Sequence, residues 1–190
     1  MGKTNLDAQE TIYQLKVTLK WIKPPIWRRI QVPGSITMFK LHRILQEVMG
    51  WENYHLYRFK IGGIYFGKPD DEMDVENVFE YKLKDLVTGE KKKIIYVYDF
   101  GDGWEHEIVV EKILPPKPDK SYPVCLKGKR ACPPEDCGGP GGYYDLVAVL
   151  QNPGHPEYNE RRSWSGDFDP EYFDLEIINE KLVPYLFKKL

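Results

Sequence analysis

The sequence predicts an α+β protein with a mixed, mainly antiparallel β-sheet, and three patterns carry this prediction. Residues 12–21 alternate apolar and polar side chains, and residues 37–49 repeat with helical period. Residues 94–100 and 104–113 are two further alternating runs, joined by a tight glycine-containing turn. Alternation is typical of half-buried strands, and a repeat of about 3.6 residues is typical of an amphipathic helix. Strands followed by helices then favour a sheet with helices packed on it.

The first two strands are expected at residues 12–21 and 26–33, joined by a proline-rich connection at 23–25. The helix at 37–49 has Thr37 as N-cap and Gly50 just past its end, which are the residue types that begin and end helices. We expect His42 at the margin of its buried stripe. The resulting ββαβ opening resembles a β-grasp by analogy.

A strand, a Gly62-Gly63 turn and a second strand are expected within residues 55–66, then an acidic loop at 69–76 and a helical turn at 83–87. In the hairpin that follows, a three-residue Gly101-Asp102-Gly103 turn would place Phe100 opposite Trp104 and Tyr98 opposite His106. That register puts His106 on the apolar face.

Residues 114–142 carry many prolines and glycines and predict an irregular loop. Helices are expected at 143–151, shortly after Pro156, and at 170–189, where Asp169 would be the N-cap and Pro184 a kink or end. We expect a single domain over residues 1–190: a sheet core at 12–113, a Cys/Pro/Gly loop at 114–142 and a helical extension at 143–190.

Composition indicates a soluble globular protein, with 42% hydrophobic residues, 29% charged residues and a net charge of −2. The chain has no apolar run of about 18–20 residues and no signal-peptide segment at its start, so we expect a cytoplasmic protein that does not enter membranes. Residues 10–68 hold ten Lys/Arg and three Asp/Glu, or +7, whereas residues 69–190 hold sixteen and twenty-five, or −9. The basic half could bind nucleic acid. Alternatively, the two halves attract each other across the fold.

Three cysteines, Cys125, Cys132 and Cys137, are spaced C-x6-C-x4-C. Their odd number argues against a closed disulfide framework, and in a reducing compartment it favours free thiols or a metal site. A structural zinc would explain how the long loop is held, with a fourth ligand from His106, His42 or His55. The alternative is that the thiols are small buried side chains.

Asp99, Asp102 and His106 could form a polar cluster with Arg28, which has to find a partner on the apolar face of residues 26–33. Asp beside a tight turn commonly binds its own backbone, so the cluster has a structural explanation as well as a catalytic one. The GGPGG run before residue 143 could bind an anion at a helix N-terminus, but it lacks the Lys-Ser/Thr of a phosphate-binding loop and is better interpreted as a helix-entry turn.

Several segments identify a family resemblance: YQLKVTLKWIKPPIWRRIQVP, LHRILQEVMGW, HLYRFKIGG, YDFGDGWEHEIVVEKI, YPVCLKGKRACPPEDCGGPGGYYDL and GDFDPEYFDLEIIN. They resemble the plasmid Ri open-reading-frame-three-like (PRiA-type) proteins, which occur on plasmids, in insertion elements and in chromosomes. The resemblance implies a fold but no activity. Some members carry a resolvase-like label, yet Ser35 lacks the arginine cluster of a serine recombinase, and the tyrosine-recombinase pattern is also missing.

The sequence therefore favours a non-enzymatic interaction or accessory module, with zinc as its possible cofactor in the cysteine loop. Its partner would be a protein or a nucleic acid. The alternative is a small hydrolase-like or nucleic-acid-processing enzyme centred on His106 with Asp99 or Asp102.

Overall fold

A computed structural model describes residues 10–69 and 74–186 of the chain. Its strands form one 8-stranded sheet in the order β5-β4-β3-β6-β7-β1-β2-β8. Neighbouring strands are antiparallel except β4 and β5, which confirms the mixed, mainly antiparallel α+β class. The strands are β1 (Ile12–Leu19), β2 (Trp27–Pro33), β3 (Tyr57–Ile61), β4 (Ile64–Gly67), β5 (Glu76–Asn77), β6 (Lys93–Tyr98), β7 (Trp104–Leu114) and β8 (Val124–Lys129).

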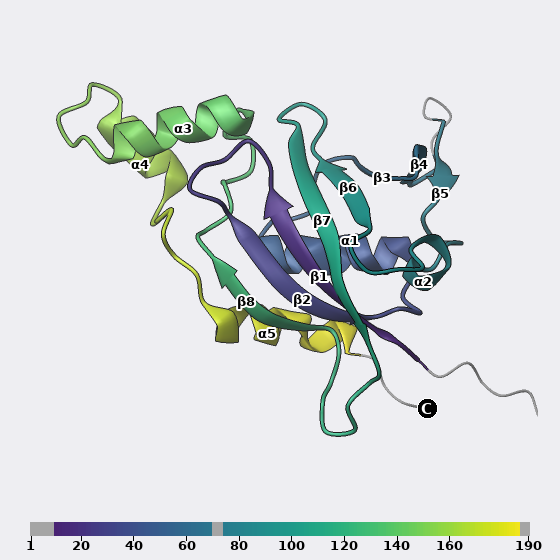
Figure 1. Ribbon diagram of the computed structural model, residues 1–190. Coiled ribbons are helices and arrows are strands. Elements are labelled where there is room, and N and C mark those ends of the chain that lie inside the picture. Colours follow the sequence, from purple (N-terminus) through teal and green to yellow (C-terminus); the bar gives the residue numbers. More distant parts are fainter. Residues whose placement is uncertain (1–9, 70–73, 187–190) are drawn as a thin grey trace, which may run out of the picture.

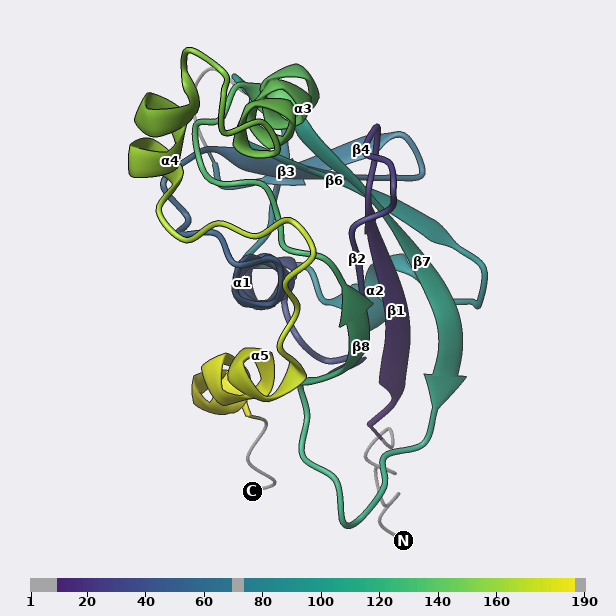
Figure 2. The ribbon, with the colours of Figure 1, turned by 90° about the vertical axis from the view of Figure 1, so that its left-hand side faces the viewer.

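Helices lie on one side of this sheet and at one end of it. They are α1 (Met38–Met49), α2 (Leu83–Leu86), α3 (Gly139–Leu150), α4 (Tyr158–Ser165) and α5 (Leu175–Leu182), with a 3-10 turn at Val183–Tyr185. Figure 2 shows α1 and α5 together on one side of β8, β2, β1 and β7, and Figure 1 shows α3 and α4 side by side at one end. None of the helices in the described ranges is long and apolar enough to cross a bilayer.

Helix α1 begins and ends where the sequence predicts. The Thr37 hydroxyl accepts a hydrogen bond from Lys40 N, and Gly50 takes the left-handed conformation, with φ 96°. His42 differs from its predicted place at the margin, because it is completely buried. Its two ring nitrogens lie 2.8 Å from Tyr96 Oη and 2.5 Å from Asn53 Oδ1, so the fold satisfies both nitrogens and the ring can enter the core.

Arg28, on the inner face of β2, is buried without a carboxylate partner among the described residues. Its Nε donates to Val48 O at 2.7 Å, at the C-terminus of α1, where a cation is favourable. Its guanidinium also donates to two strand carbonyls and lies 4.9 Å from the Phe173 ring centroid. Arg28 therefore joins β2, α1 and the segment before α5, and it is not part of a cluster with Asp99 and His106.

The β6–β7 hairpin forms, but the predicted register is wrong by two residues. Tyr98 pairs with Trp104 and Tyr96 pairs with His106, instead of Phe100 with Trp104 and Tyr98 with His106. The reason is Asp99, whose φ of 56° ends the strand early and whose carbonyl accepts from Gly103 N at 2.7 Å. The turn therefore spans residues 99–103. The predicted face of His106 is unaffected, because a shift of two residues keeps the same side of the sheet.

Residues 114–142 are more regular than predicted. They contain β8, which pairs with β2, and the first turn of α3. The sequence signal for β8 is weak because VCLKGK is an edge strand with polar residues and a glycine. The GGPGG run enters α3 itself, with Pro140 in its first turn. The acidic loop expected at 69–76 lies partly outside the described residues.

The last helix starts later than predicted. Helix α5 begins at Leu175, and its N-cap is Asp174 rather than Asp169. Asp174 Oδ1 accepts from Glu176 N and Ile177 N, whereas Asp169 Oδ1 accepts from Glu171 N in a separate turn. Both Asp169 and Asp174 are residues of the type that caps helices. Helix α5 begins after Asp174, where it packs against β8 and α1. Pro184 ends α5 as expected, and residues 187–190 lie outside the described part of the chain.

Candidate metal centre

Three loops that are distant in sequence meet at one end of the sheet. They are residues 50–56 between α1 and β3, residues 99–103 between β6 and β7, and residues 130–138 between β8 and α3. Trp51 Nε1 donates to Pro133 O at 3.1 Å, Asp99 N donates to Leu56 O at 2.9 Å, and Gly138 N donates to Asp102 Oδ2 at 3.1 Å. Each loop is therefore fastened to another by at least one direct hydrogen bond.

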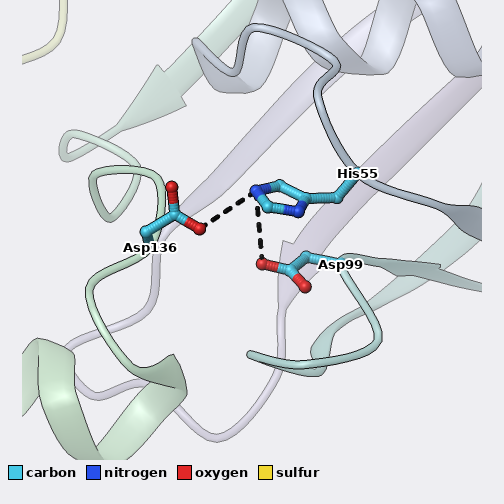
Figure 3. A group of neighbouring side chains, drawn as sticks. All are labelled: His55, Asp99 and Asp136. Carbon is cyan, nitrogen blue, oxygen red and sulfur yellow. Dashed lines mark ion pairs between the residues drawn. The ribbon is translucent and has the colours of Figure 1, made fainter.

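His55 lies where these loops meet, surrounded by carboxylates. Its Nε2 is 3.1 Å from Asp136 Oδ1, 3.7 Å from Asp99 Oδ2 and 3.7 Å from Glu135 Oε2. Figure 3 shows the Asp99 and Asp136 carboxylates converging on this nitrogen from two sides. In the described ranges, His55, Asp99 and Asp136 are the one group of three potential ligands whose atoms all lie within 4.8 Å of one another. The site thus combines one imidazole with carboxylate oxygens.

The Asp99 carboxylate is oriented by the turn that it begins. Its Oδ1 accepts from Gly101 N at 2.9 Å and from Asp102 N at 3.3 Å. The side chain is only 9% exposed, and its Oδ2 accepts no hydrogen bond from the described residues and lies toward His55. One oxygen of Asp99 is therefore used by the protein, and the other is presented to the site.

Glu135 is held in the same manner. Its Oε1 accepts from Tyr98 Oη and from Glu52 N, each at 2.9 Å, so its Oε2 is left for the site. Burial, together with the hydrogen bond to Glu135, raises the pKa of Tyr98, which keeps its hydroxyl protonated as a donor. The Tyr98 ring stacks on Trp51 at 4.9 Å and meets the His55 ring edge-on at 5.9 Å. Outer-shell contacts of this kind are what orients carboxylates and imidazoles around a metal.

Two atoms of the site are buried without a hydrogen-bond partner among residues 10–69 and 74–186: Nε2 of His55 and Oε2 of Glu135. Nε2 is close to Asp136 Oδ1, but the contact lacks the geometry of a hydrogen bond. The site holds three carboxylates, those of Asp99, Glu135 and Asp136, against at most one positive charge on His55, an excess of at least two negative charges. Burying like charges and unpaired polar atoms is unfavourable, and a divalent cation would offset both costs.

The first residue of α3, directly after the 130–138 loop, is packed too closely for any residue larger than glycine. Gly139 has φ 67°, and a Cβ there would lie 2.5 Å from Asp102 O. A residue with a side chain at position 139 would therefore push residues 130–138 away from the β6–β7 turn, and Asp136 with them.

The three cysteines of the predicted zinc site are in loop 130–138 and on β8, and they are not part of the group formed by His55, Asp99 and Asp136. All three are free; Cys125 on β8 and Cys137 are buried, and Cys132 is half-buried. Burial raises the pKa of Cys125 to about 11 and of Cys137 to about 12, and it raises that of Cys132 as well. In the described part of the chain, the three thiols do not come within the spacing found for His55, Asp99 and Asp136. A zinc ion on the thiols stays a prediction for elemental analysis.

His106 is enclosed in the core, with no exposed surface. Its Nδ1 lies 3.3 Å from Tyr96 O, and the Trp51 ring packs against it at 5.1 Å. Burial lowers the pKa of His106 to about 4, so the ring is neutral. Asp99 and Asp102 make their contacts with the β6–β7 turn, His55 and Gly138 instead. The structure thus gives no support to catalysis by His106 with these carboxylates.

Sequence reasoning named Asp99 as a site residue and His55 as one of three alternatives for a fourth ligand, but it missed Glu135 and Asp136. Both lie inside CPPEDC, a segment that sequence reasoning interpreted only through its two cysteines. The adjacent Glu135 and Asp136 in a proline-rich loop are the sequence feature that could have indicated a cation site. Only the fold could show that this loop meets His55.

Comparison with known proteins places the chain among relatives without an assigned activity. The sequence model described as plasmid pRiA4b ORF-3-like protein matches residues 11–177. The uncharacterised protein y4hQ of Sinorhizobium fredii is 38% identical over 163 residues, which are 84% of this chain and 83% of that protein. The crystal structure of MM3350 from Methanosarcina mazei, a protein of unknown function, is 42% identical with a TM-score of 0.82 and covers 88% of this chain and 97% of its own.

Proposed function

This chain belongs to the plasmid pRiA4b ORF-3-like family, and from the geometry of the site we propose that it is a non-enzymatic accessory module that binds a divalent cation. The cation would be held by His55, Asp99, Glu135 and Asp136 and would fasten the three loops together. One observation carries the proposal: ligand atoms of His55, Asp99 and Asp136 lie within 4.8 Å of one another, Glu135 Oε2 lies 3.7 Å from the same imidazole nitrogen, and among the described residues none of the four atoms facing the site makes a hydrogen bond.

The spacing of these atoms supports a tetrahedral ion. Zinc binds imidazole nitrogen and carboxylate oxygen at about 2.1 Å, which puts neighbouring ligand atoms of a tetrahedron about 3.4 Å apart. The distances from His55 Nε2 to Asp136 and Asp99, 3.1 and 3.7 Å, lie on both sides of that value, whereas Glu135, 3.7 Å from the same nitrogen, lies outside the mutually close group and would have to move inward to complete the tetrahedron. Imidazole suits zinc better than magnesium or calcium, so we expect zinc to bind most tightly and manganese less tightly.

The number of ligands supports a structural role. Three protein ligands are already grouped, and Glu135 would be the fourth; four protein ligands fill a tetrahedral zinc, whereas catalytic zinc keeps one position open for water or substrate. Three of the four side chains are largely covered, with 28% exposure for His55, 9% for Asp99 and 16% for Glu135. Asp136, at 69%, is the exposed one and would close the site from the solvent side. The odd number of thiols supports a reducing location for such a module, as in the cytoplasm.

Elemental analysis and calorimetry test this function. Full-length protein purified without chelator should contain about one zinc per chain, and apo protein should bind Zn²⁺ more tightly than Mn²⁺, with Mg²⁺ weakest. His55→Ala should remove the bound zinc, whereas His155→Ala, a histidine in the α3–α4 connection, should keep it. Cys132→Ser should also keep it. Loss of zinc from the serine variant, or zinc that survives His55→Ala, would overturn the proposal.

A further inference from the structure

A second feature, independent of the metal centre, is the basic face of the sheet. We use this name for the outward side chains of β1, β2 and β8, on the side away from α1 and α5 (Figure 2). The register places Lys16 beside Arg29, Arg29 beside Lys127, and Trp27 beside Lys129. Because directly paired residues point to the same side of a sheet, these five side chains form one surface.

Positive charge dominates this face. Lys16, Arg29, Lys127 and Lys129 are its cations, and among the described residues only Arg29 has a carboxylate partner, Glu111. A hollow next to it is lined by Arg29, Lys127, Lys91 and Lys112, with Glu111 as its one acid. The other two acids on this side of β7, Glu107 and Glu105, are paired with Lys93 and Lys20. The positive half of the chain seen in the sequence is thus gathered partly on this surface, and it is neutralised across the fold only in part, by the pairs Arg29–Glu111 and Lys20–Glu105.

An aromatic ring lies among the cations. The Trp27 ring is half-buried on β2, with Lys16 Nζ and the Arg29 guanidinium each 5.5 Å from its centroid. Trp21, which follows β1 at the same end of the β1–β2 hairpin, is 67% exposed, with Lys20 Nζ 4.6 Å from its ring. These cations lie over the rings, and a lysine that turns to bind a phosphate leaves its ring free to stack a base.

From charge complementarity and these rings we propose that the basic face binds single-stranded nucleic acid. The backbone phosphates would bind Lys16, Lys127 and Lys129, whereas Arg29 is held by Glu111, and a base would stack on Trp27. The half-buried ring favours unpaired bases over a duplex, because duplex bases are not free to stack on a side chain. This inference stands or falls separately from the cation site, since no ligand of that site lies on the basic face.

Fluorescence anisotropy with labelled 12-nucleotide dT and rU oligomers tests the proposal. Binding by the full chain should weaken with salt, with a slope in log K against log[salt] of about −0.7 per phosphate contact. Lys127→Ala with Lys129→Ala should reduce the magnitude of that slope by about 1.4, because two contacts are lost. The matched control is Lys40→Ala with Lys181→Ala, two exposed lysines on α1 and α5, which should change neither the slope nor the affinity. The two oligomers distinguish DNA from RNA, although they differ in the C5 methyl of the base as well as in the sugar, and binding of either supports the proposal.

The stacking step has its own control. Trp27→Ala should weaken oligomer binding about tenfold, a loss typical of one stacked base, and should leave binding of poly-glutamate unchanged. Thermal melting of each variant shows that the fold is intact. Absence of oligomer binding at low salt would overturn the proposal. So would equal binding of duplex, single strand and poly-glutamate together with an unaffected Trp27→Ala variant, which would indicate an acidic partner without bases.

Discussion

Nε2 of His55 lies 3.1 Å from Oδ1 of Asp136, although one residue belongs to the loop before β3 and the other to the loop before α3. The contact is not a hydrogen bond, and the same nitrogen also faces Asp99 and Glu135. Three carboxylates thus lie around one imidazole. Asp99 and Glu135 each use their other oxygen in hydrogen bonds within the protein, and a cation could bind the atoms that remain.

Asp99→Asn should have opposite effects on stability with and without the cation. Asparagine keeps an oxygen for Gly101 N and Asp102 N but removes a negative charge from the site. With chelator present, the variant should be more stable, by an amount on the order of 1 kcal/mol, because repulsion between carboxylates is relieved. With zinc present, it should be less stable and bind zinc at least about tenfold more weakly. Thermal melts in both buffers measure this, and shifts of equal sign would contradict the account.

Gly139→Ala should destabilise the protein by about 1–3 kcal/mol, because it places a side chain at φ 67° and 2.5 Å from Asp102 O. Gly141→Ala is the matched control in the same helix, since a Cβ there has no neighbour within 4 Å. Chemical denaturation of both variants decides the matter. Equal free energies of unfolding for the two variants would show that the loop does not pack on the β6–β7 turn as described.

Stability should fall as the pH is lowered from 6.5 toward 4. Burial lowers the pKa of His106 to about 4 and of His42 to about 3, from an ordinary value of 6.5. Within that window the unfolded chain binds protons that the folded chain does not, so the stabilisation is fully present above pH 6.5 and is lost toward the folded-state values. In His106→Leu, the slope of unfolding free energy against pH between 5 and 6 should decrease by about 1.4 kcal/mol per pH unit. An unchanged slope would mean that His106 is not buried as a neutral ring.

Asp174→Ala should cost about 1 kcal/mol of stability, the usual effect of losing an N-cap. Its Oδ1 accepts the first free N–H groups of α5, and α5 packs on β8 and α1. The comparison is Asp169→Ala, the residue that the sequence favoured as the cap, which binds only Glu171 N in a turn outside any helix. Urea denaturation should show the larger loss for position 174, and the reverse order would place the helix start at 170.

The elements that the sequence predicted well are those whose signals are local. Thr37 and Gly50 mark the two ends of α1 as predicted, because capping depends on residues within one turn. Strands β6 and β7 were predicted from the alternation of apolar and polar residues within each strand. The predicted register of the β6–β7 hairpin was wrong because the register depends on the left-handed φ of Asp99. Aspartate can adopt this conformation but does not require it. Strand β8 was missed because its pairing with β2 outweighs a poor local propensity.

The site was less predictable than the fold. Cys125, Cys132 and Cys137 attracted the metal prediction because cysteines carry a recognisable spacing, whereas carboxylates are common on any surface. His55 and Asp136 become neighbours only through the packing of the 130–138 loop on Trp51 and Asp102, which involves contacts distant in sequence. No pattern within a single segment encodes that meeting.

X-ray absorption spectroscopy of the zinc-loaded protein tests the central claim most directly, because it reports which atoms surround the metal. Ligation by His55, Asp99, Glu135 and Asp136 predicts a first shell of nitrogen and oxygen at about 2.0–2.2 Å, with imidazole scattering that disappears in His55→Ala. A shell of sulfur at about 2.3 Å would place the ion on the cysteines and contradict the account.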